Sequence, residues 1–244
     1  MGRCVQGVAL HGDVTHPFPP ATHGGPQRPR RTMNLLLAGA TGLIGSALVQ
    51  AWHGPGTLHL LVRRPLDRIG PLQQVHIVDF AALPVLPPAD AALCALGTTI
   101  KVAGSQAAFR AVDFEAVLAF AKAARAAGVR KLAVVSSLGA DRRSSNFYSR
   151  VKGEMEVAVA GLGFDSVIVA RPSLLTGDRH ALGQPRRAGE SLTQGLLAPL
   201  SPFIPMVWRP IAGATVARAL LRALEQAEPG LRLLDSAQLQ RLGR

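Results

Sequence analysis

The sequence predicts an α/β protein built on one doubly wound parallel sheet, and three observations support this. The chain has 244 residues, 48% of them hydrophobic, which suits a single α/β domain with a large core. From residue 34 onward, short apolar runs alternate with amphipathic segments, the pattern of parallel strands joined by crossover helices. A glycine-rich turn directly follows the first apolar run, where a strand would pass into a helix.

Each element is predicted from its own residue pattern. Apolar runs predict strands at 34–38, 58–62, 75–78, 91–96, 131–136, 166–170 and 231–234, and amphipathic segments predict helices at 43–52, 113–127, 145–160 and 214–226. We expect Asp113 to open the second helix and Ser144 or Ser145 to open the third. Gly128 and Gly161 are expected to end these two helices.

Two segments fall outside this alternation. Residues 1–32 mix Gly, Pro, His and Arg without periodicity, and we interpret them as a disordered tail or as sequence upstream of a true start at Met33, so that the domain covers 33–244. Residues 176–210 are rich in Gly, Pro and Arg and predict a small cap on the substrate side of the domain. Within it, the apolar segment Leu192–Trp208 is broken by prolines, so we interpret it as a lid or homodimer patch, with weak membrane contact as an alternative.

Composition disfavours several classes of protein. The formal charge is +12, but only four lysines are present and the arginines are scattered, so nucleic-acid binding is not favoured. Cys4 and Cys94 offer neither a disulfide framework nor metal-ligand spacing, which favours a reducing, cytoplasmic location and no metal site. No run of 18 apolar residues free of Gly and Pro predicts a membrane-spanning helix.

The turn after the first strand has the spacing of a dinucleotide-binding loop. It comprises Gly39, Ala40, Thr41, Gly42, Leu43, Ile44 and Gly45. Gly39 would permit the tight turn, Gly42 would let a pyrophosphate approach the backbone, and Gly45 would let the helix pack close to the strand. The alternative is an ordinary glycine-rich turn, but the strand and helix context favours a Rossmann-type cofactor site.

The end of the second strand favours NADP(H) over NAD(H). An acidic residue there would bind the ribose hydroxyls of NAD, but Arg63 and Arg64 stand in its place and could grip a 2′-phosphate. The alternative is a pair of solvated surface arginines. Asp79, at the end of the third strand, is predicted either to contact the adenine amino group or simply to cap the strand.

A second group of residues offers acid–base chemistry. Tyr148 is the chain's one tyrosine, and Lys152 follows four residues later, on the same face of a predicted helix. A neighbouring ammonium stabilises a phenolate, so Tyr148 could exchange a proton with a carbonyl oxygen while Lys152 also holds the cofactor ribose. Ser137 is predicted to polarise that carbonyl, and Ser136 lies beside the cofactor; a one-residue slip in the strand would exchange their roles.

Together these motifs resemble the atypical short-chain dehydrogenase/reductases. A closer resemblance, to the Tat-interacting-protein-like oxidoreductases, covers about 33–235 and is carried by Ala95–Thr99, Ala103-Gly104, Val112-Asp113, Val135–Ala140, Asn146–Glu154 and Arg171-Pro172. The resemblance implies cofactor contacts by Leu96, Gly97, Tyr148, Lys152, Pro172, Ser173, Leu174 and Arg179, and by the arginine pair. It carries no substrate contacts over 180–210, where the sequence diverges.

The expected function is NADPH-dependent reduction of a small carbonyl compound. Ser137, Tyr148 and Lys152 form the expected catalytic set. The alternative is a non-catalytic protein that binds NADP(H) and reports redox state to a protein partner, as some relatives are thought to do. The intact Ser, Tyr and Lys favour the enzyme.

Overall fold

The computed structural model describes residues 32–177 and 205–244. The predictions for the N-terminal tail, for most of the cap at 176–210 and for Arg179 lie outside these ranges. Within them, no helix is long and apolar enough to cross a membrane.

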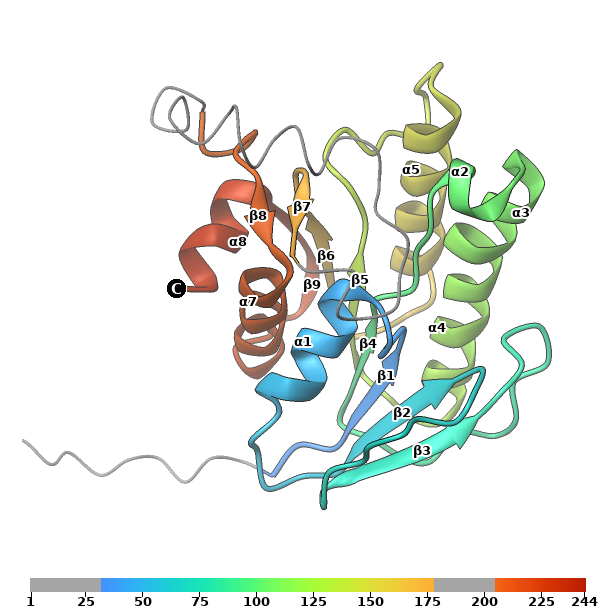
Figure 1. Ribbon diagram of the computed structural model, residues 1–244, viewed down its shortest axis with the longest axis vertical. Coiled ribbons are helices and arrows are strands. Elements are labelled where there is room, and N and C mark those ends of the chain that lie inside the picture. The colour runs from blue at the N-terminus through green and yellow to red at the C-terminus, as the bar shows by residue number, and fades with distance from the viewer. Residues whose placement is uncertain (1–31, 178–204) are drawn as a thin grey trace, which may run out of the picture. The chain divides into compact units, whose positions relative to one another are not determined.

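Seven parallel strands form the central sheet, in the order β3-β2-β1-β4-β5-β6-β9. Their bounds are β1 Leu35–Ala38, β2 Leu58–Val62, β3 Gln73–Ile77, β4 Ala91–Cys94, β5 Lys131–Val135, β6 Ser166–Arg171 and β9 Gly230–Asp235. The order runs outward in both directions from β1 and β4, so the predicted doubly wound sheet is confirmed (Figure 1). In such sheets a ligand crevice opens beyond the carboxyl ends of the strands where the order reverses, here between β1 and β4.

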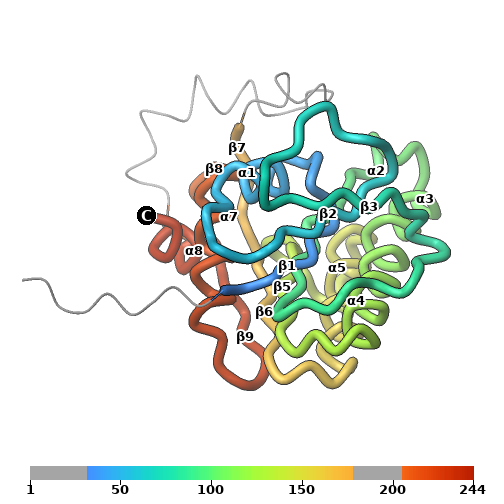
Figure 2. The backbone as a smooth tube through the Cα atoms, turned by 90° about the horizontal axis from the view of Figure 1, so that it is seen from below, coloured from blue at the N-terminus to red at the C-terminus, as the bar shows by residue number. Residues whose placement is uncertain are grey.

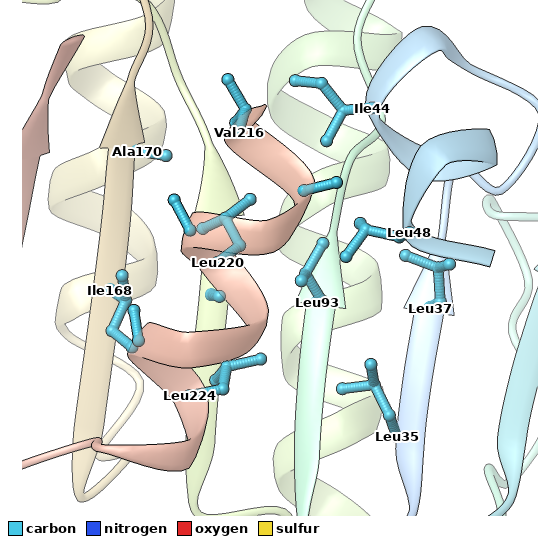
Figure 3. Packing of buried hydrophobic residues seen from close by; sticks show 14 of the residues in the cluster. Leu35, Leu37, Ile44, Leu48, Leu93, Ile168, Ala170, Val216, Leu220 and Leu224 are labelled. Atoms are coloured by element: carbon cyan, nitrogen blue, oxygen red, sulfur yellow. The ribbon is translucent and has the colours of Figure 1, made fainter. Parts of the chain in front are cut away.

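Helices cover both faces of the sheet (Figures 1 and 2). Helices α1 (Leu43–Ala51) and α7 (Gly213–Glu225) lie on one face, and α4 (Val117–Ala126) and α5 (Phe147–Ala160) lie on the other. Because both faces are buried, the two central strands, β1 and β4, are apolar throughout, and every residue of both is buried. Figure 3 shows Val216, Leu220 and Leu224 of α7 packed toward the sheet.

Several short elements complete the fold. Helices α2 (Ile100–Ala103) and α3 (Gln106–Arg110) follow β4, and a π-helical turn, η1 (Ala111–Ala116), joins α3 to α4. A small parallel ribbon pairs β7 (Leu175–Thr176) with β8 (Ile211–Ala212), and α8 (Ser236–Leu242) follows β9. The sequence patterns predicted none of α2, α3, β7, β8 and α8, because each is too short to show a periodicity of its own.

The structure corrects the predicted helix starts. Asp113 does not open a helix, because the helical run already begins at Gln106 and Ser105 caps it by accepting from the Ala108 amide. Helix α5 is capped by Asn146, whose side-chain Oδ1 accepts from the Ser149 amide, and not by Ser144 or Ser145. All three candidates are good N-cap residues, so the local sequence could not choose among them.

The two predicted helix ends, at Gly128 and Gly161, are confirmed. Gly128 lies just past the C-terminus of α4 with φ +87°, the left-handed conformation expected of it. Gly161 follows the last residue of α5, at φ −81°. Strand β4 is two residues shorter than predicted, because Ala95 and Leu96 leave the sheet to form the edge of the cleft described below.

Candidate cofactor and catalytic site

The glycine turn after β1 is packed too tightly for side chains at two of its glycines. Gly39 has φ +89°, and a Cβ there would lie 2.6 Å from the Ala95 carbonyl carbon. A Cβ at Gly45 would lie 2.0 Å from the Gly39 carbonyl oxygen, whereas at Gly42 the nearest atom is 3.4 Å away. Gly42 precedes α1 and offers no side-chain cap to its first amides. The turn therefore presents unobstructed backbone at a helix N-terminus, which is suited to a phosphate.

A cleft of about 950 Å³ opens beside this turn, at the carboxyl ends of the strands. Its lining includes the predicted residues Gly39, Thr41, Gly42, Arg63, Arg64, Asp79, Leu96 and Gly97. These residues follow four different strands, β1 to β4, and the parallel sheet brings them to one edge. A cleft of this size can take a dinucleotide in part or in full.

Leu43 and Ile44, two residues of the predicted cofactor loop, do not line the cleft. Leu43 packs against Gly177 and Gly213, where a Cβ would lie 2.5 Å and 2.8 Å from Leu43 side-chain atoms. Ile44 is buried in the core cluster beneath α7. Any contact that these two residues make with a phosphate would have to come from their backbone amides in the first turn of α1.

Three charged residues of the cleft, Arg63, Arg64 and Asp79, are exposed at strand ends. Arg63 and Arg64 directly follow β2, and neither has an acidic side-chain partner among the ion pairs of the described residues. Asp79 Oδ1 accepts from the Ala81 amide at 2.9 Å, so this carboxylate caps its own turn while also facing the cleft. Both interpretations of Asp79 from the sequence are therefore compatible with its position.

Lys152 is buried and forms an ion pair with a residue that the sequence did not identify as functional. Its Nζ lies 2.7 Å from Asp113 Oδ1, and their side chains are 4% and 0% exposed. The second Asp113 oxygen accepts from the Thr98 amide at 2.8 Å. Burial by itself would lower the pKa of Lys152, but the Asp113 carboxylate, helped by Tyr148 and Cys94, raises it above the usual value.

Gly97 connects this ion pair to the cleft. It lines the cleft, and a Cβ there would lie 3.3 Å from Asp113 Oδ1 and 3.8 Å from Lys152 Nζ. The Lys152 ammonium therefore lies immediately behind the loop that follows β4. A side chain at position 97 would crowd the carboxylate and separate the cleft from the ammonium.

Tyr148 lies one helical turn before Lys152 on α5, as predicted. It is half-buried, and its ring packs 5.2 Å from that of Phe109. Tyr148 is one of the groups that raise the pKa of Lys152, after Asp113. Tyr148 is not among the residues that line the cleft.

Ser136 and Ser137 directly follow β5, and both hydroxyls are buried without a hydrogen-bond partner in the described residues. A buried hydroxyl normally has a partner, so two adjacent hydroxyls without one are unusual. Lys152 Nζ lies 3.5 Å from the Val135 carbonyl, just before this pair. The structure thus brings Ser136, Ser137 and Lys152 together, but does not decide between the two serines.

Hydrogen bonds to the rest of the protein hold the segment after β6, so not all of its residues are available to a ligand. The Pro172 carbonyl accepts from the Leu138 amide at 3.0 Å, which joins this segment to the loop after Ser137. Ser173 Oγ bonds with the Arg209 carbonyl and with Ser236 Oγ, so its hydroxyl is occupied. Leu174 is 43% exposed.

Comparison with known proteins identifies the family. A family model described as NAD(P)H-binding matches residues 39–227, from the first glycine of the turn to two residues past the end of α7. The chain belongs to this NAD(P)H-binding family. Protein HTATIP2 of Rattus norvegicus is 34% identical over 226 residues, covering 86% of this chain and 89% of the relative. This confirms the resemblance to the Tat-interacting-protein-like group.

Other relatives and structures agree with this assignment. Mitochondrial protein FMP52-1 of Scheffersomyces stipitis is 28% identical over 225 residues, covering 86% of this chain and 98% of the relative. The structure of MoeE5 with UDP-glucose and NAD aligns with a TM-score of 0.63 at 18% identity, covering 82% of this chain and 75% of that one. The oxidoreductase ylbE of Lactococcus lactis aligns with a TM-score of 0.58 at 14% identity, covering 86% and 96%. At these identities the structural matches support the Rossmann-type fold alone.

Proposed function

We propose that this protein is an NADPH-dependent reductase of a small carbonyl compound, with Ser137, Tyr148 and Lys152 as its catalytic residues. One observation carries the proposal. The Lys152 ammonium lies directly behind Gly97, at one end of a cleft whose other lining residues suit a dinucleotide. The family assignment supports NAD(P)H binding, and the choice of NADP(H) rests on the arginine pair.

The residues of the cleft fit such a cofactor. A Cβ at Gly39 or Gly45 would clash with neighbouring backbone and deform the glycine turn, whose amides could hold a pyrophosphate. Arg63 and Arg64, free of acidic partners among the described ion pairs, can give charge-assisted hydrogen bonds to a 2′-phosphate. When bound, a reduced nicotinamide supplies a hydride.

The chain's own residues would then transfer the proton to the substrate. The Tyr148 phenol would donate its proton to the carbonyl oxygen, and the Lys152 ammonium would stabilise the phenolate that remains. The Ser137 hydroxyl, which has no partner among the described residues, would donate a hydrogen bond to the same oxygen as negative charge develops there. Ser136 is the alternative donor.

A second candidate function is a redox sensor that binds NADP(H) without turnover, since the family match is to NAD(P)H binding and names no reaction of this chain. The names of the FMP52 relatives place those proteins in mitochondria, so the cytoplasmic location expected from the cysteine content gains no support from them and stays a prediction.

An NADPH-consumption screen across aldehydes, ketones and quinones tests the reductase. We expect at least one carbonyl class to oxidise NADPH, and we expect Tyr148→Phe to abolish that turnover with little change in NADPH affinity, because it removes only the hydroxyl that donates the proton. Ser149→Ala is the matched control, since it removes a hydroxyl from the next position of the same helix. Silence across the whole screen, with NADPH bound normally, would favour the sensor.

A further inference from the structure

Lys152 and Asp113 form a buried ion pair directly behind the loop at Gly97. Replacing a buried ion pair with apolar residues is often neutral or stabilising, so the pair is not explained by stability alone. A lysine buried to this degree without a counter-charge tends to lose its proton. Lys152 therefore needs a counter-charge to stay protonated beside the cleft.

The groups that face Lys152 come from three elements. They are Asp113 from η1, Tyr148 from α5 and Cys94 from β4. Burial raises the pKa of the Cys94 thiol to about 12, so the thiol is uncharged in the neutral range. Among these groups, Asp113 is the one carboxylate.

The local backbone fixes Asp113 in place. The π-helical turn η1 interrupts the run between α3 and α4 at this residue, and such single turns are frequent at functional sites. The Thr98 amide holds one carboxylate oxygen, which leaves the other facing Lys152. Asp113 is therefore held at both oxygens, once by a backbone loop and once by the ammonium.

We propose that Asp113 is a positioning residue that keeps Lys152 protonated and holds its ammonium against the cofactor-facing loop at Gly97. The inference rests on the proposed function, because a charged Lys152 matters there for the cofactor ribose and for Tyr148. The charge itself can be tested without cofactor or substrate.

The test compares the unfolding of Asp113→Asn with that of the natural chain from pH 7 to pH 10. In the natural chain the pKa of Lys152 is raised, so its contribution to stability is present throughout and is lost only above the usual lysine pKa, about 10.4. In Asp113→Asn, burial would lower that pKa, so the folded state would release the proton first and gain stability as the pH rises. We expect the difference between the two urea midpoints to be largest at pH 7 and to shrink toward pH 10.

A purely structural role for Asp113 predicts otherwise, namely a difference that stays constant with pH. A constant or growing difference would overturn the proposal. Glu156→Gln is the matched control: it makes the same change at a buried carboxylate paired with Arg171, whose guanidinium stays charged over this range, so its effect should be constant. The double variant Asp113→Asn with Lys152→Met has no ammonium to bury and should also lose the pH dependence.

Two further results complete the test. If Asp113→Asn alone is unfolded at pH 7, the double variant should still fold, and its failure would count against the proposal. If the protein binds NADPH, the ratio of the variant's Kd to the natural Kd should grow about tenfold from pH 7 to pH 9 as Lys152 loses its charge. A natural chain that does not bind NADPH would refute the proposed function, yet the unfolding comparison would still decide the role of Asp113.

Discussion

Gly45 lies so close to Gly39 that a Cβ on Gly45 would approach the Gly39 carbonyl oxygen to 2.0 Å. This contact joins the first turn of α1 to the end of β1, and it leaves the turn no freedom to move away. Both the packing of α1 and the shape of the phosphate-facing loop therefore depend on a hydrogen atom at position 45.

Gly45→Ala should destabilise the protein by at least about 2 kcal/mol, because the clash is with backbone that cannot rotate aside. It should also weaken NADPH binding, since relief of the clash must deform the turn. Urea unfolding and a fluorescence titration with NADPH measure the two effects. Gly54→Ala is the control, because a Cβ there meets only a Trp52 ring atom at 3.9 Å. Equal stability of the two variants would contradict the account of this turn.

The arginine pair should determine which cofactor binds better. Replacing both Arg63 and Arg64 with Ala should reduce the preference for NADPH over NADH by about tenfold or more, since hydrogen bonds to charged groups contribute roughly 1.5–3 kcal/mol each. NADH affinity itself should change little. Arg232→Ala removes an exposed arginine from β9, away from the cleft residues, and should leave the preference intact. An unchanged preference in the double variant would remove these arginines from cofactor recognition.

The two serines after β5 can be separated by single substitutions. If the protein is a reductase, we expect Ser137→Ala to lower kcat by about 100-fold, as the loss of a donor to a developing oxyanion does elsewhere. Ser136→Ala should have a smaller effect, mainly on cofactor affinity. The opposite ranking would assign Ser136 as the donor. The relevant measurement is kcat at saturating NADPH, together with the NADPH Kd of each variant.

A pair of histidines at the edge of the sheet predicts sensitivity to acid. His59 Nδ1 lies 3.1 Å from His76 Nε2, and burial, together with the charge of His76, lowers the pKa of His59. A histidine with a lowered folded pKa stabilises the protein above its unfolded pKa of about 6.5, and this stability is lost as the pH falls.

Urea unfolding at pH 7 and pH 5 should therefore show a loss of stability at the lower pH. His59→Leu should reduce that loss, because Leu cannot take up a proton in the unfolded chain. The exposed His53 offers a control, and His53→Gln should retain most of the loss. An equal acid sensitivity in the natural chain and in His59→Leu would place its origin elsewhere.

The sequence by itself determined the class of fold, the strand positions and the cofactor loop, because these depend on residues close together in the chain. Strand β2 matches its predicted bounds, 58–62, and the apolar runs alone marked all seven strands of the sheet. The glycine spacing, Arg63 and Arg64 were found in the same way, as short motifs at the ends of strands. The Tyr148 and Lys152 pair needed only the four-residue spacing of a helix.

Only the tertiary structure shows the partner of Asp113. In the sequence it stands before an amphipathic segment, where an aspartate is a good helix cap, and its partner Lys152 lies 39 residues away. No local pattern reports a contact across that separation. The pairing arises because the π-helical turn before α4 and the middle of α5 meet beneath the loop at Gly97, so that the buried ammonium has a carboxylate beside it.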